Sequence, residues 1–286
     1  MKTAVITDTN SGITAREAGE RGIFLLPMPV IIDDEIYFEG QNLTEEQFYG
    51  ALTGGRKITT SMPSPGDVLD LWEKVLSMGH KELVYIPMSS GLSQSCSAAM
   101  GLAGSYEGQV FVADNHRISV TMRESVFMAA DLAEQGASGA EIKEMLEKDA
   151  YNSSIYISVD TLEYLKKGGR ITPAAAMLGS VLSIKPILTI QGERLDSFAK
   201  ARSMKKCQVR MIEAIENDIK NRFGAKDKAR MRIGAAGAGL TAGEAEGWRR
   251  AVEEAFPYAD VFYNPLSVSI GCHVGPGAYG IGISFR

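Results

Sequence analysis

The first half of the chain alternates short apolar runs with segments of helical periodicity. Residues 3–6, 83–88 and 109–113 have the length and apolar character of buried strands. Residues 65–78 and 122–135 instead repeat apolar side chains at helical spacing. This alternation predicts an α/β fold in which a parallel sheet is covered by helices on both faces.

Local signals mark where several elements begin or bend. Thr44 is followed by Glu45-Glu46-Gln47, a capping box that predicts a short helix over residues 45–52. Ser64 and Pro65 have the pattern of an N-cap and a first helical position. Two prolines break the apolar run of residues 22–32, which predicts an edge strand or a bent connection there.

The composition changes after the polar stretch of residues 151–154. At 286 residues the chain fits two domains better than one, so we predict an N-terminal α/β domain of residues 1–153 and a C-terminal α/β domain of residues 154–286. Met177-Leu178 and Val181-Leu182 are interpreted as core rather than as a ligand wall. In the second half we predict strands at residues 155–159, 233–236, 261–263 and 280–285, a hairpin at 186–195, and helices at 162–167, 203–223 and 244–256.

Charge, cysteine content and hydropathy exclude several classes of protein. The chain has 30 Lys and Arg against 35 Asp and Glu, a net charge of −5, which argues against a nucleic-acid partner. The 3 cysteines are widely spaced and form no CxxC pair, so we expect neither a disulfide framework nor a metal site, and a reducing cytoplasm is the simplest location. The N-terminus resembles a strand rather than a signal peptide, and no apolar run reaches the roughly 20 residues of a membrane span.

Three segments place small hydroxyl residues just after a strand, before a helix or turn. They are residues 7–11, 59–64 and 88–93. Ligands of open α/β sheets bind beyond the carboxyl ends of the strands, and a helix N-terminus with a hydroxyl beside it can hold an anion. Ser93 is therefore a candidate donor to a carboxylate or phosphate, although any one such residue is more often a simple helix cap.

His273 is the histidine with the most distinctive surroundings. It lies among four glycines and a proline, between two apolar runs that resemble strands, so we predict a rigid turn that aims its ring at a ligand. Arg170 follows Gly168-Gly169, and its spacing alone favours a solvated arginine after a glycine C-cap over a cation near the site.

A hydrolase is one alternative for these residues. The order Ser93 then His273 is that of an α/β-hydrolase, but the segment around Ser93 lacks the second glycine of G-x-S-x-G and no acid partner is evident. The chain also has no G-x-x-x-x-G-K-[ST] loop, which argues against a P-loop kinase. A sensor of another small organic acid is a further alternative.

Taken together, these stretches resemble the DegV family, whose members include the fatty-acid-binding FakB subunits of bacterial fatty acid kinase. The resemblance covers about 270 residues. It rests on Thr7-Asp8-Thr9, Thr60-Ser61-Met62-Pro63-Ser64, Ser89-Ser90-Gly91-Leu92-Ser93, residues 162–171 with Gly168-Gly169-Arg170, Lys185-Pro186-Ile187-Leu188, and His273-Val274-Gly275-Pro276-Gly277.

The resemblance implies a two-domain α/β protein that holds a long-chain fatty acid between its domains and presents the carboxylate to a separate kinase. Such a protein has no chemistry of its own, no metal and no cofactor, and at most transient membrane contact. The implied carboxylate ligands are Thr60, Ser61, Ser93 and His273, with Gly91 in the same binding set. Arg170 is implied to lie near the head group and to serve phosphoryl transfer.

The chain departs from the family pattern at three places. Met62 stands where the family usually has Gln, Gln94-Ser95-Cys96 where it usually has Gly-Thr-Tyr, and Tyr279 where it usually has Leu. None of these changes removes an implied head-group ligand, but they affect the expected helix start near Ser93 and the choice of acyl chain.

Overall fold

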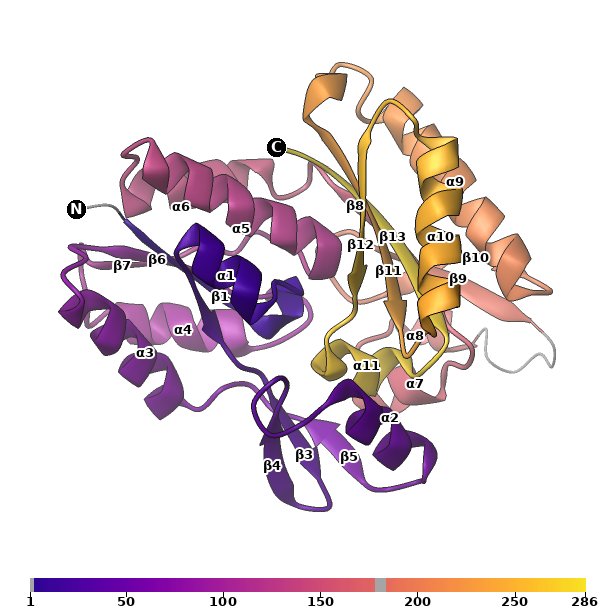
Figure 1. Cartoon of the computed structure of the whole chain (residues 1–286), viewed down its shortest axis with the longest axis horizontal. Coiled ribbons are helices and arrows are strands. Elements are labelled where there is room, and N and C mark those ends of the chain that lie inside the picture. Colours follow the sequence, from indigo (N-terminus) through magenta and orange to yellow (C-terminus); the bar gives the residue numbers. More distant parts are fainter. Residues whose placement is uncertain (1–2, 178–183) are drawn as a thin grey trace.

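The computed structural model describes residues 3–177 and 184–286, and its first large sheet is fully parallel (Figure 1). The strand order is β2 (Ile23–Leu26), β1 (Ala4–Asp8), β6 (Leu83–Ile86) and β7 (Val110–Val112). Helices α1 (Ala15–Arg21), α5 (Ser119–Glu134) and α6 (Gly139–Asp149) pack on one face, and α3 (Pro65–Ser77) and α4 (Ser95–Ala103) on the other. The predicted parallel sheet with helices on both faces is confirmed.

A second sheet is formed entirely by strands after Ser153. Its order is β10 (Asp196–Ala201), β9 (Lys185–Ile190), β8 (Ser154–Ser158), β13 (Ala278–Phe285), β11 (Met231–Ala238) and β12 (Asp260–Pro265). Among these described strands, β11 and β12 pair in parallel and the other neighbours are antiparallel. Helices α9 (Met204–Asn221) and α10 (Ala242–Ala255) bury one face of it. The domain boundary after Ser153 stays a prediction.

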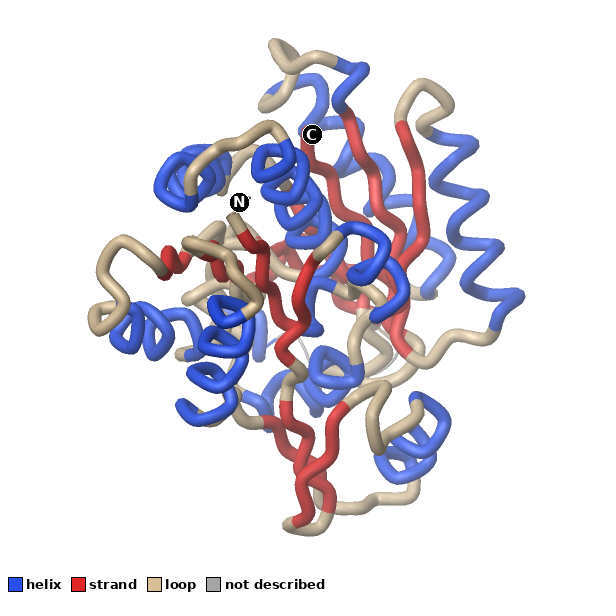
Figure 2. Tube along the Cα trace, turned by 60° about the vertical axis from the view of Figure 1, so that its left-hand side comes forward, coloured by secondary structure: helices blue, strands red, loops and turns tan. Residues whose placement is uncertain are grey.

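A small third sheet projects below the two large sheets (Figures 1 and 2). It pairs β3 (Pro29–Ile32) with β4 (Glu35–Phe38) and with β5 (Ile58–Thr60), both antiparallel, and α2 (Glu45–Thr53) packs against it. The apolar run of residues 22–32 contains β2, an edge strand of the parallel sheet as predicted, and bends before β3, which belongs to a different sheet. This sheet places Thr60 at the end of β5.

Helix α5 connects the two large sheets. It packs on β1 of the parallel sheet and also on β11 and β13 of the second sheet. Its start therefore lies between the sheets, where the opposite face of the second sheet is free of α9 and α10. This is the space in which the candidate site is found.

Two further expectations concern the membrane and residues 177–182. Within the described part of the chain, no helix is long and apolar enough to cross a bilayer. Met177 is 78% exposed, so the interpretation of this residue as core is wrong. Leu178, Val181 and Leu182, which belong to the same expectation, lie outside the described residues.

Candidate functional site

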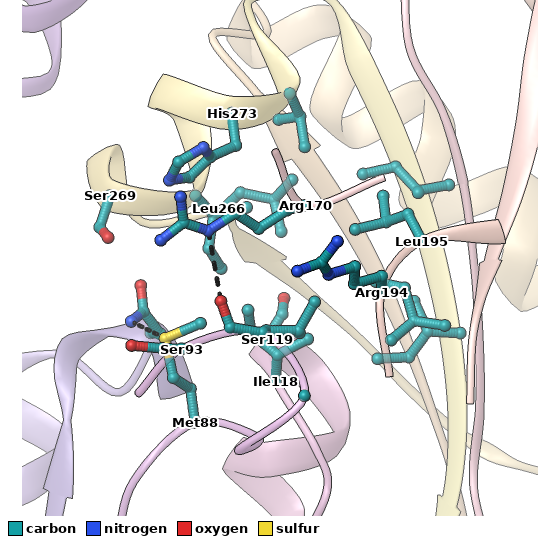
Figure 3. A pocket seen from close by; sticks show the side chains of 18 of the residues that line it. Met88, Ser93, Ile118, Ser119, Arg170, Arg194, Leu195, Leu266, Ser269 and His273 are labelled. Atoms are coloured by element: carbon teal, nitrogen blue, oxygen red, sulfur yellow. Dashed lines mark hydrogen bonds between the residues drawn. The ribbon is translucent and has the colours of Figure 1, made fainter. Parts of the chain in front are cut away.

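A cavity of about 590 Å³ lies between the parallel sheet and the second sheet (Figure 3). This volume is within the usual range for a small-molecule site, about 300–1,000 Å³. Its lining comes from both halves of the chain and includes all of the residues predicted to bind ligand: Thr60, Ser61, Gly91, Ser93, Arg170 and His273.

His273 lies on a helix, α11 (Val268–Val274), and the expectation of a turn between two strands is wrong. The β-branched Val268 and Ile270 resemble a strand in sequence, but tertiary context overrides such weak local preferences. Ser267 caps the helix by accepting a hydrogen bond from the Ile270 amide at 3.2 Å. Glu39 accepts a second one from the Val268 amide at 3.1 Å.

The two ring nitrogens of His273 have different surroundings. Its Nε2 lies 2.9 Å from the Thr60 hydroxyl oxygen, and its buried Nδ1 has no hydrogen-bond partner among the described residues. Burial and the neighbouring Arg170 lower the pKa of His273 to about 4. The imidazole is therefore neutral at pH 7, with one nitrogen able to donate and the other able to accept.

Two glycines let α7 (Glu163–Gly168) pack closely against α11. A Cβ on Gly168 would lie 2.2 Å from Nδ1 of His273, and a Cβ on Gly275 would lie 2.3 Å from the Tyr164 ring. Both distances are far below a normal carbon contact. The glycines of the two motifs therefore allow two helices to interlock and fix the position of the imidazole.

Arg170 follows the left-handed C-cap Gly169 and is partly buried, so the interpretation as a solvated arginine is wrong. Its Nε donates to the Leu92 carbonyl at 3.3 Å, and its Nη1 donates to the Gly168 carbonyl. Figure 3 shows the guanidinium directed into the cavity beside the His273 ring. The side chain thus connects the segment before Ser93 with the end of α7.

Ser93 and Gly91 lie in the segment before α4. The helix begins at Ser95 rather than at residue 93, and the Ser93 hydroxyl accepts a hydrogen bond from the Ser95 amide at 3.2 Å. A Cβ on Gly91 would lie 2.6 Å from the Gly192 carbonyl oxygen. Close packing against the β9–β10 connection therefore explains why residue 91 is glycine. The role of Gly91 in ligand binding stays a prediction.

Sequence reasoning missed several polar residues of the cavity, namely Asn10, Ser269 and Arg194. Asn10 belongs to one of the three hydroxyl-rich segments, and its Oδ1 accepts a hydrogen bond from Ser267 at 2.9 Å. Asp8 beside it is completely buried and accepts bonds from the Asn10 and Met88 amides, both at 2.8 Å. Burial raises the pKa of Asp8 to about 6. No local motif points to Ser269 or Arg194.

A family model described as "Uncharacterised protein, DegV family" matches residues 2–286. The chain belongs to the DegV family. It is 31% identical over 288 residues to a DegV domain-containing protein of Listeria monocytogenes, a match that covers 100% of this chain and 99% of that protein. The resemblance stated from the motifs is thereby confirmed.

Solved structures of this family share the fold. A structure described as fatty acid binding of a DegV family protein from Thermus thermophilus has a TM-score of 0.88 at 28% identity, over 100% of both chains. The structure of DegV from Bacillus subtilis, described as a fatty acid binding protein, has a TM-score of 0.86 at 28% identity, again over 100% of both chains. The predicted two-domain α/β fold is confirmed by these matches.

In this DegV protein the positions that depart from the family pattern have different surroundings. Met62 and Gln94 line the cavity. Gln94 is also the N-cap of α4 and makes no side-chain capping bond, so this helix start lacks the usual hydroxyl cap. Tyr279 belongs to the core on the other face of the second sheet, beside Trp248.

The geometry does not favour a hydrolase. Within the described residues, His273 pairs with Thr60 through Nε2 and has no partner at Nδ1, so Ser93 has no hydrogen bond to a base. Nucleophilic catalysis by serine needs that bond and a third group that orients the base. No group of three or more His, Cys, Asp or Glu side chains among the described residues is arranged to hold a metal ion.

Proposed function

We propose that this protein binds one long-chain fatty acid in the cavity between its two sheets. The carboxylate lies at the end formed by Thr60, Ser93, Arg170 and His273, and the acyl chain runs along the apolar wall. The proposal is carried by one observation: a mostly apolar cavity has hydroxyls, a neutral imidazole and guanidinium groups in its lining, while none of its described lining residues is Asp or Glu.

The chemistry of both ends supports this ligand. A buried carboxylate is costly unless several donors satisfy it, and hydroxyls, imidazole N–H and guanidinium supply such donors. Each buried methylene contributes about 0.8 kcal/mol, so a chain of roughly 14–16 methylenes supplies ample gross affinity before ordering costs. The apolar wall is formed by Ile118, Val120, Ile155, Ile157, Leu165, Ile190, Leu195, Leu266 and Val274.

The protein acts, in this proposal, as the substrate-carrying subunit of a cytoplasmic fatty acid kinase system. It performs no chemistry itself, and a separate kinase phosphorylates the carboxylate to an acyl phosphate. Arg170 lies beside the head group and serves the phosphoryl transfer. Contact with a membrane, where fatty acids are collected or delivered, is transient at most.

The decisive experiment is native mass spectrometry of the protein after gentle purification. We expect a bound mass of one fatty acid per chain, and retention of added palmitate or oleate by protein stripped of lipid. A matched series of short organic acids should not bind, which separates this function from that of a sensor of small acids. Absence of both co-purified and added fatty acid would contradict the proposal.

Arg170→Ala is expected to weaken fatty acid binding only slightly and to lower the rate of acyl phosphate formation by a partner kinase much more. The reason is that Thr60, Ser93 and His273 still hold the carboxylate, while a cation beside the developing charge is lost. Arg194→Ala, which removes a second arginine of the cavity lining, is the matched control. Equal losses of binding and of phosphorylation in Arg170→Ala would contradict the assigned role.

A further inference from the structure

The sheet face that borders the cavity carries large side chains on two strands and small residues on the next two. In register across β9, β8, β13 and β11 lie Leu188, Ile157, Gly280 and Ala236. Ile157, Gly280 and Ala236 all line the cavity. The floor of the cavity is therefore deepest above β13 and β11.

Above the next pair of residues along β13 and β11, the space is occupied by a side chain of the protein. Gly282 and Gly234 face each other in register, and Val120 from the start of α5 packs onto both. A Cβ on Gly234 would lie 2.4 Å from Cβ of Val120, and one on Gly282 would lie 2.8 Å from its Cγ2. These glycines are thus required by the packing of α5.

Gly280 has different surroundings. A Cβ built on it would meet Cβ of Ala236 at 3.5 Å and the Tyr156 carbonyl oxygen at 3.7 Å, which are ordinary contacts. The described lining of the cavity includes Gly280 and Val120 but neither Gly282 nor Gly234. The cavity therefore extends over Gly280 and is closed by Val120.

We propose that Gly280 and Val120 set the length of acyl chain that the cavity accepts. Gly280 leaves the floor open for the distal methylenes, and Val120 is the wall against which the chain ends. This inference rests on the proposed fatty acid function and adds to it the residues that choose among ligands.

Gly280→Val places two methyl groups in the space above β13. Burial of one methylene is worth about fourfold in affinity, so exclusion of two or more should weaken palmitate and stearate binding at least about 15-fold. Decanoate and laurate have shorter chains and should bind nearly as they do to the unmodified protein. Val120→Ala has the opposite effect, because it opens the space above Gly282 and Gly234 and favours the longest acids.

The experiment measures Kd for decanoate, laurate, myristate, palmitate and stearate with lipid-free protein. Tyr279→Phe is the control, since Tyr279 is the neighbour of Gly280 on β13 and faces the opposite side of the sheet. We expect the preferred length to fall in Gly280→Val, to rise in Val120→Ala, and to stay constant in the control. If Gly280→Val does not fold, the change of preferred chain length in Val120→Ala alone decides whether the proposal holds.

These measurements test fatty acid binding and the assignment of chain length to Gly280 and Val120 separately. If the unmodified protein binds none of these acids, the proposed function is wrong. If it binds them and the folded Gly280→Val and Val120→Ala variants keep its order of affinities, fatty acid binding stands and the assignment of chain length to these residues is overturned.

Discussion

Gly168→Ala is expected to weaken fatty acid binding at least tenfold and to lower the free energy of unfolding by about 1–3 kcal/mol. The added methyl would lie 2.2 Å from Nδ1 of His273, inside the ring's own volume. The ring cannot retreat without leaving the Thr60 hydroxyl, which is 2.9 Å from Nε2. Both the helix contact and the head-group end of the cavity are therefore disturbed by a single methyl.

The backbone at Gly168 does not explain such a loss. It is the last residue of α7 and its φ is not in the left-handed region, so helix propensity alone would favour alanine by about 1 kcal/mol. Gly247→Ala is the matched control, because Gly247 is an exposed position of α10 where an added methyl would have no atom within 4 Å. Denaturant unfolding and palmitate titration of both variants test the effect. Unchanged affinity in Gly168→Ala would show that α7 does not fix His273.

Local sequence signals predicted most elements because their causes are local. The capping box at Thr44 forms as expected with Gln47, and Ser64 is the N-cap of α3 as expected, where Asp67 completes a capping box that was not predicted. The parallel sheet followed from alternation, since short apolar runs separated by helices can pair in few ways. Hydroxyl residues after strands also pointed to the correct end of the sheet.

Errors arose where long-range packing decides the structure. The strand-like residues of α11 form a helix that Ser267 and Glu39 cap and that packs against α2, and Glu39 is more than 200 positions away in sequence. Burial raises the pKa of Glu39 to about 7, another effect that no local pattern encodes. The glycines beside Arg170 and His273 suggested turns. One of them, Gly168, instead makes room for the His273 ring of the distant helix α11.

The candidate site also contains residues that local motifs predict and residues that only long-range packing brings together. Its hydroxyls and histidine could be named from motifs, and the family resemblance gave them one common ligand. The apolar wall could not be named, because it combines one face of β8, β9, β11 and β13 with the start of α5. Which face of a strand meets a ligand depends on the register between strands far apart in sequence.

His273→Ala is expected to weaken fatty acid binding by about 1–3 kcal/mol, or about 5- to 150-fold. The substitution removes a donor to the carboxylate and leaves the Thr60 hydroxyl without its ring partner. Ser93→Ala removes another donor and should cause a loss of similar size. Cys272→Ala is the control, since Cys272 precedes His273 on α11, packs toward α2 and is not among the described residues of the cavity lining. Titration with palmitate at pH 7.5 measures all three, and unchanged affinity in both His273→Ala and Ser93→Ala would refute their assignment as head-group ligands.

The pH dependence of stability gives an independent check on the state of His273. Its pKa is about 4 in the folded protein and near 6.5 in an exposed histidine, so the unfolded chain binds the proton more tightly. The contribution of the neutral His273 ring to the free energy of unfolding is therefore fully present above pH 6.5 and is lost as the pH falls toward 4. Asp8, whose pKa is raised to about 6, acts in the opposite direction, but it is present in both proteins and cancels in their difference. The gap in unfolding free energy between the unmodified protein and His273→Ala should therefore narrow from pH 7 to pH 4.5. A constant gap across this range would mean that the ring is not held neutral by burial.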